Sequence, residues 1–292
     1  DTEGSTKTAI ETLGLIQDAV TDLVGTADMM DMLSAKTVWK KFGDDCQYHP
    51  GVYQETPPNI KDKNVVIVDF SYKRPVMEYI ISNAKSVLIL DHHKSAIEDL
   101  KDIPITDKFN RVFDTARSGA MITWNYYHSE EPAPLLIKYI QDRDLWEHRL
   151  PKTKEINSAL SSYDFNFEEW DTLARLRSLN NLIPIGEALL KKQRKDINSL
   201  LDSCVRTMII GDTEVLVANI PPFLASDAGN LMCIDQPFSA TYYDTEDARV
   251  FSLRSDVKGV DVSEIAKHYG GGGHKHAAGF KQELGWEGEM PF

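Results

Sequence analysis

The stretch Ser86-Val87-Leu88-Ile89-Leu90-Asp91-His92-His93 decides which fold we expect for this chain. It joins a short apolar run, of the length and composition of a buried parallel strand, to one carboxylate and two imidazoles. Open α/β sheets bind their ligands outside the carboxyl ends of their strands. The stretch therefore predicts a buried strand that presents functional side chains at its end.

A second stretch repeats this pattern earlier in the chain. Asn64-Val65-Val66-Ile67-Val68 is another buried-strand run, and it ends in Asp69. Either stretch alone also fits a helix-capping aspartate or a satisfied histidine pair. Carboxylates and imidazoles at two neighbouring strand ends are ligands that suit divalent transition metals. The two stretches together favour a metal site.

The pattern between these strands is helical. Arg74 to Asn83 and Ser95 to Leu100 follow the two strand signals, and Pro134 to Trp146 is a further helix. Alternating strands and helices of this kind are typical of parallel sheets. We expect an α/β fold with a doubly wound, mainly parallel sheet. We also predict a short strand at Cys46–His49 and a helical pattern that continues from Glu155 to Leu176.

The second half of the chain has its own strand and helix signals. We expect a first domain over residues 1–184, in which 1–38 is a divergent or truncated start, and a connector helix over 185–204. A smaller α/β domain with a mixed sheet then covers 205–284, and 285–292 is a tail. Within it, Gly211-Asp212 separates two strand patterns and predicts a hairpin.

A run of four glycines, Gly270 to Gly273, precedes His274 and Lys275. Ordered glycines cost about 1 kcal/mol each relative to Ala in a helix or strand, so the fold should gain something there. Backbone N–H groups without neighbouring Cβ atoms can cradle an anion. A flexible linker is the alternative, but the packing-type residues that follow, Ala277 to Phe280, argue against it.

Composition limits the function. The 292 residues carry a formal net charge of −13, which repels long duplex nucleic acid but not a small anion held by metals. The three cysteines have no metal-type spacing, and no apolar run is long enough to span a bilayer. The start, from Asp1, does not have the pattern of a signal peptide. We expect a cytoplasmic protein with no membrane partner.

With these motifs in place, the chain resembles the DHH phosphoesterase superfamily with its DHH-associated carboxyl-terminal domain. The resemblance rests on Asp69, on Asp91-His92-His93 and on the Gly270–Phe280 stretch. It extends from about Trp39 to Leu284 and is similar to the RecJ-like and nanoRNase-like members. Three shorter stretches add to it: Asp114 to Ala120, Gln141 to Trp146, and Ser226 to Asn230.

The resemblance implies a phosphoesterase with two metal ions, usually Mn²⁺, with Mg²⁺ as an alternative. It makes Asp69 a ligand that bridges both ions, His92 a ligand of one ion, and Asp142 the residue that completes that shell, with Asp144 in reserve. Asp91 would orient the histidines, and His93 would face the scissile phosphate. The residues implied for substrate binding are Arg254, Ser255, Gly271, Gly272, Gly273 and His274.

One motif of this family has no clean copy here. Members begin with a strand and an acidic loop that gives ligands to both metals. Asp1 and Glu3, Asp28 and Asp31, or residues upstream of this chain are the alternatives for that loop. Without such ligands, the protein could bind nucleotides or phosphate without hydrolysing them.

The expected function is hydrolysis of phosphodiester bonds in short single-stranded oligonucleotides or linear dinucleotides by a two-metal mechanism. The alternative from a different class is a degenerate, non-catalytic family member that binds nucleotides or phosphate. Other enzyme options are a cyclic dinucleotide phosphodiesterase, a single-strand exonuclease and an exopolyphosphatase.

Overall fold

The computed structural model describes residues 29–49, 51, 56–164 and 166–289, with side chains from Met32 onward. Contacts between residues divide the chain into two units. The first extends to Ile183, apart from His93–Ser95, which group with the second unit from Pro184 onward. The first unit contains a parallel sheet and the second a separate mixed sheet, so the expected α/β fold class is confirmed.

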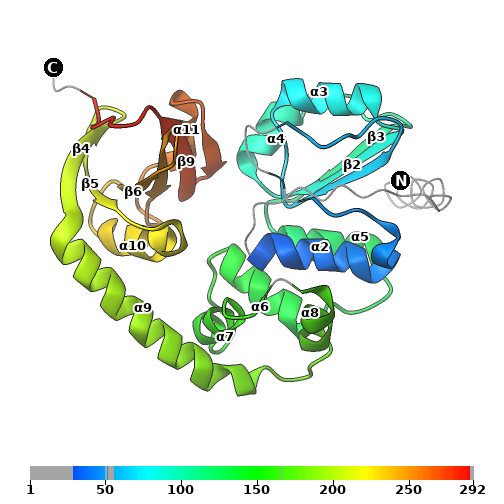
Figure 1. Cartoon of the computed structure of the whole chain (residues 1–292), viewed down its shortest axis with the longest axis horizontal. Coiled ribbons are helices and arrows are strands. Elements are labelled where there is room, and N and C mark those ends of the chain that lie inside the picture. Colours follow the sequence, from blue (N-terminus) through cyan, green and yellow to red (C-terminus); the bar gives the residue numbers. More distant parts are fainter. Residues whose placement is uncertain (1–28, 50, 52–55, 165, 290–292) are drawn as a thin grey trace. The chain divides into compact units, whose positions relative to one another are not determined.

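The sheet of the first unit consists of three parallel strands in the order β1-β2-β3 (Figure 1). They are β1 (Asn64–Val68), β2 (Ser86–Asp91) and β3 (Phe109–Phe113). Four of the five residues of β1 and five of the six of β2 are buried. Both runs are apolar throughout because helices cover both faces of the sheet.

Two pairs of helices cover these faces (Figure 1). The helices are α2 (Met29–Phe42), α3 (Arg74–Asn83), α4 (Lys94–Leu100) and α5 (Gly119–Tyr127). Side chains alternate along β2, so Ile89 packs in a core with α3 and α4, whereas Leu90 packs in another core with α2 and α5. This arrangement is doubly wound, as the sequence predicts.

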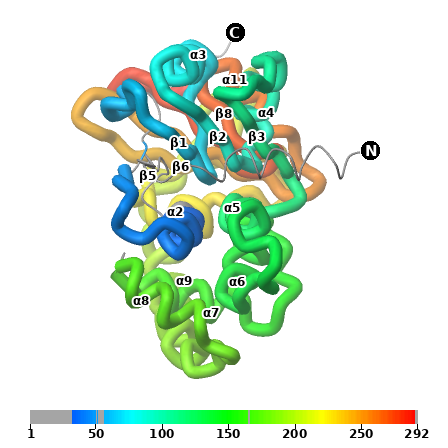
Figure 2. The backbone as a smooth tube through the Cα atoms, turned by 90° about the vertical axis from the view of Figure 1, so that its right-hand side faces the viewer, coloured from blue at the N-terminus to red at the C-terminus, as the bar shows by residue number. Residues whose placement is uncertain are grey.

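A further helical layer lies on the side of α2 and α5 away from the sheet (Figure 2). It consists of α6 (Leu135–Asp144), α7 (Thr153–Leu160) and α8 (Phe167–Ala174), packed around the fully buried Trp170. The prediction of one helical pattern from Glu155 to Leu176 is wrong in its middle. There Asn166 caps α8 by accepting from the Glu169 N–H, and the Trp170 indole donates to the carbonyl of Asp164.

Two strand expectations also differ from the structure. Cys46–His49 is not a strand: it follows the short 3₁₀ helix η1 (Gly43–Asp45), and the Tyr48 hydroxyl donates back to the Gly43 carbonyl. No strand in the described ranges pairs with it. Conversely, β3 was not predicted because Asn110 and Arg111 interrupt its apolar pattern, although it pairs with β2 along its whole length.

The second unit is a six-stranded mixed sheet with helices on both faces. After the 3₁₀ helix η2 (Asn180–Leu182), its elements are α9 (Ile183–Cys204), β4 (Val205–Ile210), β5 (Thr213–Asn219), η3 (Pro222–Leu224), α10 (Ala225–Met232), β6 (Ser239–Asp244), β7 (Arg249–Arg254), α11 (Val262–His268), β8 (Gly272–His274) and β9 (Ala277–Gln282). The strand order is β4-β5-β6-β7-β9-β8, and only β5 and β6 pair in parallel.

The predicted hairpin at Gly211-Asp212 is confirmed. Both residues have φ of 58°, which is the left-handed conformation that a tight two-residue hairpin turn needs. Along β5, Val215 and Val217 pack with α11, and Ala218 packs with α9 and α10. The sheet therefore has one hydrophobic core on each face.

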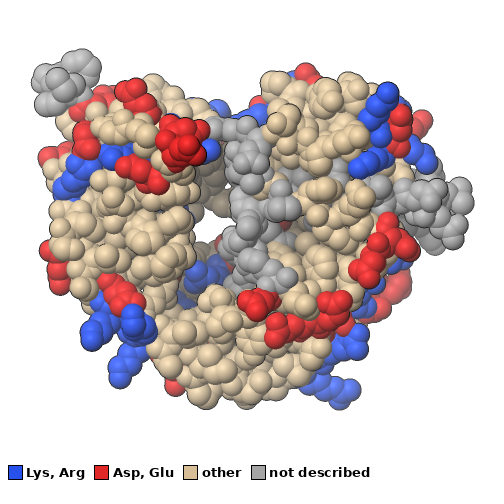
Figure 3. Space-filling model, viewed as in Figure 1, with Lys and Arg blue, Asp and Glu red and all other residues tan. Residues whose placement is uncertain are grey.

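Helix α9 carries a strongly basic surface, visible as the blue side chains gathered over it in Figure 3. The exposed residues are Lys191, Lys192, Arg194 and Lys195. Lys192 pairs with Asp196 one turn later, which fits a solvated helix face. Among the described helices, none combines the length and the apolar character that crossing a bilayer requires.

Candidate metal site

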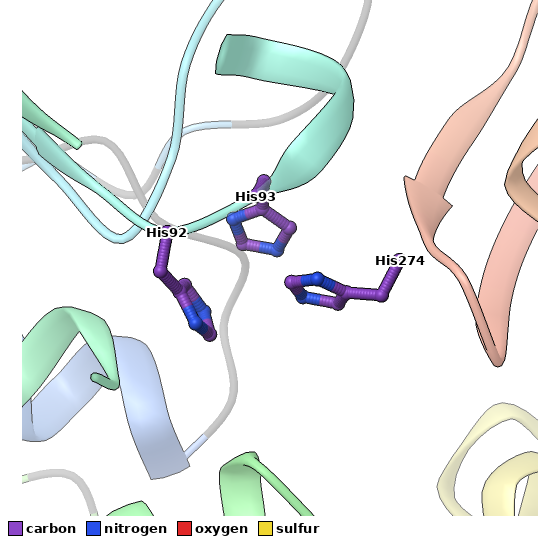
Figure 4. A group of neighbouring side chains, drawn as sticks. All are labelled: His92, His93 and His274. Atoms are coloured by element: carbon purple, nitrogen blue, oxygen red, sulfur yellow. The ribbon is translucent and has the colours of Figure 1, made fainter. Parts of the chain in front are cut away.

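The candidate site is built at the carboxyl ends of β1 and β2. Asp69 directly follows β1, and Asp91 is the last residue of β2, with His92 next to it. His92 and His93 are drawn in Figure 4 on the segment that leads from β2 to α4. All three side chains are buried: Asp69 is 5% exposed, Asp91 0% and His92 2%. Charged groups are rarely buried unless they are paired or bind a metal. The two sequence motifs therefore meet in space, as parallel strands require.

Asp69 is the residue on which the other groups converge. Its Oδ2 accepts from the Ser34 hydroxyl at 3.0 Å, and its Oδ1 lies 3.1 Å from His92 Nε2. Its backbone has φ of 56°, a conformation that residues with a Cβ rarely adopt and that is found at functional sites. Its N–H donates to the Leu90 carbonyl at 2.8 Å, which fixes this turn against β2.

Gly119, at the start of α5, leaves the space that the Asp69 side chain occupies. A Cβ on Gly119 would lie 2.2 Å from Asp69 Cγ and 2.3 Å from its Oδ1. Contacts this short do not occur, so a larger residue would displace the carboxylate. Ser118, Gly119 and Ala120 are small, which lets this helix start close to another part of the chain, and that part is the Asp69 carboxylate.

Asp144, at the end of α6, completes the group. Its Oδ2 lies 3.5 Å from His92 Nε2, and one ligand atom each from Asp69, His92 and Asp144 lie within 4.8 Å of one another. Asp144 was the reserve to Asp142 in the sequence analysis. The structure thus places Asp144, rather than Asp142, close to Asp69 and His92.

Asp142 instead holds the turn between α6 and α7. Its carboxylate accepts from the Arg149 N–H at 2.8 Å, the Leu150 N–H at 3.0 Å and the Thr153 hydroxyl. Burial alone raises the pKa of Asp142, but these hydrogen bonds lower it below its usual value. Both Asp142 oxygens therefore accept hydrogen bonds within this turn, and Asp142 is in none of the groups of described side chains that could share a metal ion.

His92 is charged by its surroundings. Burial lowers its pKa, but the hydrogen bond with Asp69 and the negative charges of Asp144, Asp69 and Asp91 outweigh that effect and raise the pKa to about 9. In the absence of a cation, the imidazolium ring balances the carboxylates. A divalent cation held by the same atoms would replace that proton, since a histidine ligand is neutral.

Asp91 and His93 form a second group with Asp69. One ligand atom from each of the three lies within 4.8 Å of the others. However, Asp91 Oδ2 accepts from the Ser71 hydroxyl at 2.6 Å and its Oδ1 accepts from the His92 N–H at 2.7 Å. These bonds fix the backbone that carries both histidines. Asp69 belongs to both groups, as a carboxylate that bridges two cations would.

The structure also places the predicted substrate-binding residues of the second unit. Arg254 on β7 pairs with Ala277 on β9, which pairs with His274 on β8, so Arg254 and His274 share one face of the sheet. The Arg254 guanidinium donates to the Ser226 hydroxyl at 2.7 Å. Ser255 is 3% exposed and hydrogen-bonds the His276 ring at 3.0 Å.

The four-glycine run, Gly270 to Gly273, is explained by the close packing of two strands. Gly272 and Gly273 belong to β8, so the run is neither a linker nor an open loop. A Cβ on Gly271 would lie 2.0 Å from the Gly279 carbonyl oxygen, and one on Gly273 would lie 2.6 Å from that of Ala277. What the fold gains from these glycines is close packing of β8 against β9.

Some expected residues lie outside the part of the chain that the structure describes. These are Asp1, Glu3 and Asp28, and the side chain of Asp31, whose backbone lies in the first turn of α2. Conversely, sequence reasoning missed Ser34. A lone serine in a helix gives no sign that its hydroxyl binds a carboxylate 35 residues later.

Comparison with solved structures identifies the fold. The DHH domain of a protein from a family of ribosomal proteins superposes with a TM-score of 0.59 at 14% identity, over 96% of this chain and 88% of that chain. This chain has a DHH-like fold. A second neighbour, an exopolyphosphatase-related protein from Bacteroides fragilis, has a TM-score of 0.51 at 13% identity, over 97% of this chain and 92% of that chain.

At the sequence level, the chain is similar to Uncharacterized protein R106 of Acanthamoeba polyphaga mimivirus. The two are 32% identical over 285 residues, which cover 89% of this chain and 66% of that protein. The chain therefore spans slightly less than two thirds of this relative. No family model matches the chain. Within the DHH-like fold, the cluster at Asp69 has donors that could hold a metal ion.

Proposed function

We propose that the chain is a metal-dependent phosphoesterase that hydrolyses phosphodiester bonds in short oligonucleotides or linear dinucleotides. The observation that carries this proposal is the convergence of Asp69, His92 and Asp144 at the strand ends of a DHH-like fold. The protonated His92 balances only one of the two carboxylates, Asp69 and Asp144, and enclosing the excess negative charge is costly unless a cation compensates it. The arrangement therefore favours a catalytic metal site over a structural ion pair.

The donor set fits a divalent transition metal. Asp69, His92 and Asp144 would hold one cation, and Asp69 would share a second with residues outside this group. An imidazole among carboxylates favours Mn²⁺ over purely oxygen-liganded cations, and Mg²⁺ is the alternative. When bound, such cations activate water and neutralise charge on the phosphoryl group.

The remaining residues position these groups. Ser34 orients Asp69 through its 3.0 Å hydrogen bond, and Gly119 keeps the space for that carboxylate free. Asp91 holds the backbone N–H of His92, so it is a positioning residue. His93 is the side chain that we propose to face the scissile phosphate, where a ring N–H would donate to a non-bridging oxygen.

A partly exposed aromatic residue supports a substrate that carries bases. Trp146 follows Asp144 by two residues, is 43% exposed and has a left-handed backbone with φ of 55°. The Arg143 guanidinium lies 5.2 Å from its ring centroid, on the same turn. A nucleobase stacked on an exposed aromatic ring gains about 1 to 3 kcal/mol. A polyphosphate chain has no group to make this contact.

In the second unit, we propose that Arg254 and His274 bind a substrate phosphate, together with the backbone of Gly271–Gly273 and with Ser255 as a support. The shared face of Arg254 and His274 supports this role. Arginine is suited to phosphate because its planar donors match two oxygens at once.

A substrate panel with Mn²⁺ tests the proposal. The purified chain should release mononucleotides from a 5′-labelled dinucleotide faster than it degrades long single strands, cyclic dinucleotides or polyphosphate, and Asp69→Asn should abolish this activity. An intact dinucleotide beside degraded long strands would contradict the substrate assignment. Tight binding of the dinucleotide without any turnover would favour the alternative, a non-catalytic nucleotide-binding protein.

A further inference from the structure

A cavity lies in the helical part of the first unit, and the proposed catalysis does not use it. Its volume is about 1080 Å³, and it is lined by α2, the segment that leads into α6 and the end of α8. We call it the α2–α8 hollow and define it by Lys36, Lys40, Trp39, Trp124, Arg175 and Arg177. None of the metal-site residues lines it.

The α2–α8 hollow has more positive than negative charge. Four cationic side chains line it, and the acidic residues that line it are two, Asp171 and Glu131. Lys36, only 2% exposed, pairs with Asp171 at 2.6 Å, and the Arg175 guanidinium pairs with the same carboxylate. One carboxylate is therefore shared between two cations.

The other charged residues of the hollow also leave an excess of positive charge. Lys40 pairs with Glu131 at 3.1 Å, so that pair is balanced. Arg177 has no acidic partner within 4.0 Å among the residues that the structure describes, and it is exposed at the edge of the hollow. The hollow thus concentrates surplus positive charge on a chain whose formal net charge is −13. Such a local field attracts anions.

The beginning of α6 adds favourable electrostatics. Pro134 and Leu135 line the hollow at this helix end, which has no side-chain cap. The first N–H groups of a helix carry partial positive charge and bind anions readily. Trp39, which is half-buried, contributes an apolar wall, whereas Trp124 is only 2% exposed and adds little surface to it. The volume is of the size that holds an organic ligand rather than a bare ion.

We propose that the α2–α8 hollow binds a phosphate ester with an organic group, such as a nucleoside monophosphate, at a site distinct from the metal site. The phosphate would lie between Arg177, Arg175 and Lys40, where guanidinium groups offer paired donors. The organic group would lie against Trp39. Lys36 and Asp171 form the buried floor that holds α2 to α8.

Tryptophan fluorescence provides a direct test, because Lys40 Nζ lies 5.2 Å from the Trp124 ring centroid and would move towards a bound phosphate. Adenosine 5′-monophosphate is titrated into the full chain in chelator, so that no cation occupies the metal site. Adenosine serves as the uncharged probe. The test variant is Lys40→Ser/Arg177→Ser, and the matched control is Lys191→Ser/Arg194→Ser on the exposed face of α9, which removes the same charge.

The expected result is a saturable fluorescence change with the monophosphate and none with adenosine. The Lys40→Ser/Arg177→Ser variant should bind at least about tenfold more weakly, since the loss of even one charged hydrogen bond to a phosphate weakens binding by about this factor or more. The α9 control and Asp69→Asn should bind as the wild type does. Equal binding by both double variants, equal binding of adenosine, loss of binding in Asp69→Asn, or no saturable change would overturn the proposal.

Discussion

Replacing Gly119 by Ala tests whether the position of one carboxylate controls metal binding. The new Cβ would lie 2.2 Å from Asp69 Cγ, whereas real Cβ atoms essentially never approach other heavy atoms within 3.0 Å. The Asp69 side chain, or the start of α5, must therefore move by at least about 0.8 Å. A shift of this size breaks the Asp69 contacts with Ser34 and His92, which are 3.0 and 3.1 Å long.

The expected effects on function and on stability differ in size. Misplacing a catalytic group by about 1 Å can cost about 100-fold in rate, and we expect at least that loss in kcat together with weakened Mn²⁺ binding. Stability should fall by about 1 to 2 kcal/mol. The broken contacts leave buried polar groups unsatisfied, at a cost of about 1 to 3 kcal/mol, and the preference for Ala over Gly in a helix, up to about 1 kcal/mol, offsets part of that cost.

Isothermal titration with Mn²⁺ and a thermal melt of the same sample measure both effects. Gly229→Ala is the matched control: it is also a helical glycine, and its Cβ would meet the flexible Arg254 side chain at 2.8 Å rather than a carboxylate of the metal site. Only Gly119→Ala should lose Mn²⁺ affinity. Wild-type affinity and turnover in Gly119→Ala would refute the role that we give to Asp69.

Four further predictions follow from the site. Asp144→Asn should abolish Mn²⁺ binding in a folded protein, as titration would show. Asp142→Asn should retain Mn²⁺ binding and lose about 2 kcal/mol of unfolding free energy, as melts would show. The reverse pattern would make Asp142 the ligand. The pKa of His92 is raised to about 9, so Mn²⁺ binding at pH 7 should release one proton, and Mn²⁺ affinity should rise about tenfold per pH unit towards pH 9. Calorimetric titrations in buffers of different ionisation enthalpy would detect the released proton. Identical binding heats in these buffers would contradict the prediction. In the metal-free protein, the same raised pKa contributes stability that is fully present below about pH 6.5 and is lost as pH rises through about 9, which melts across this range would show. Trp146→Ala should raise KM at least about fivefold for a dinucleotide and leave hydrolysis of a base-free phosphodiester unchanged; equal effects on both substrates would argue against stacking.

The strands that carry the site could be predicted because burial on both faces of the sheet gives a continuous apolar run in the sequence. A run such as Val87 to Leu90 is apolar at every position, and the polar residues begin where the strand ends. β3 could not be predicted in the same way, since Asn110 and Arg111 make its pattern ambiguous. The error at Cys46–His49 has the opposite cause: local residues suit a strand, but a strand forms only where a neighbour pairs with it.

Some residues of the site could not be predicted because their contacts depend on the three-dimensional path of the chain. Asp142 and Asp144 are two positions apart near a helix end, and only the three-dimensional path of the following turn decides which one faces His92. Ser34 is joined to Asp69 by packing of α2 on the sheet, which no local pattern reveals. The conformational cost of the Gly270–Gly273 run predicts that the fold gains something there, but only the structure shows that the gain is the close approach of β9.

The most direct test of the central claim is hydrolysis of a 5′-labelled dinucleotide by the full chain with Mn²⁺, compared with Asp144→Asn and with chelator. Our account predicts release of labelled mononucleotide by the wild type and loss of that release in both comparisons, while the Asp144→Asn protein stays folded. Undiminished release by Asp144→Asn, or release that persists in chelator, would contradict a metal site formed by Asp69, His92 and Asp144.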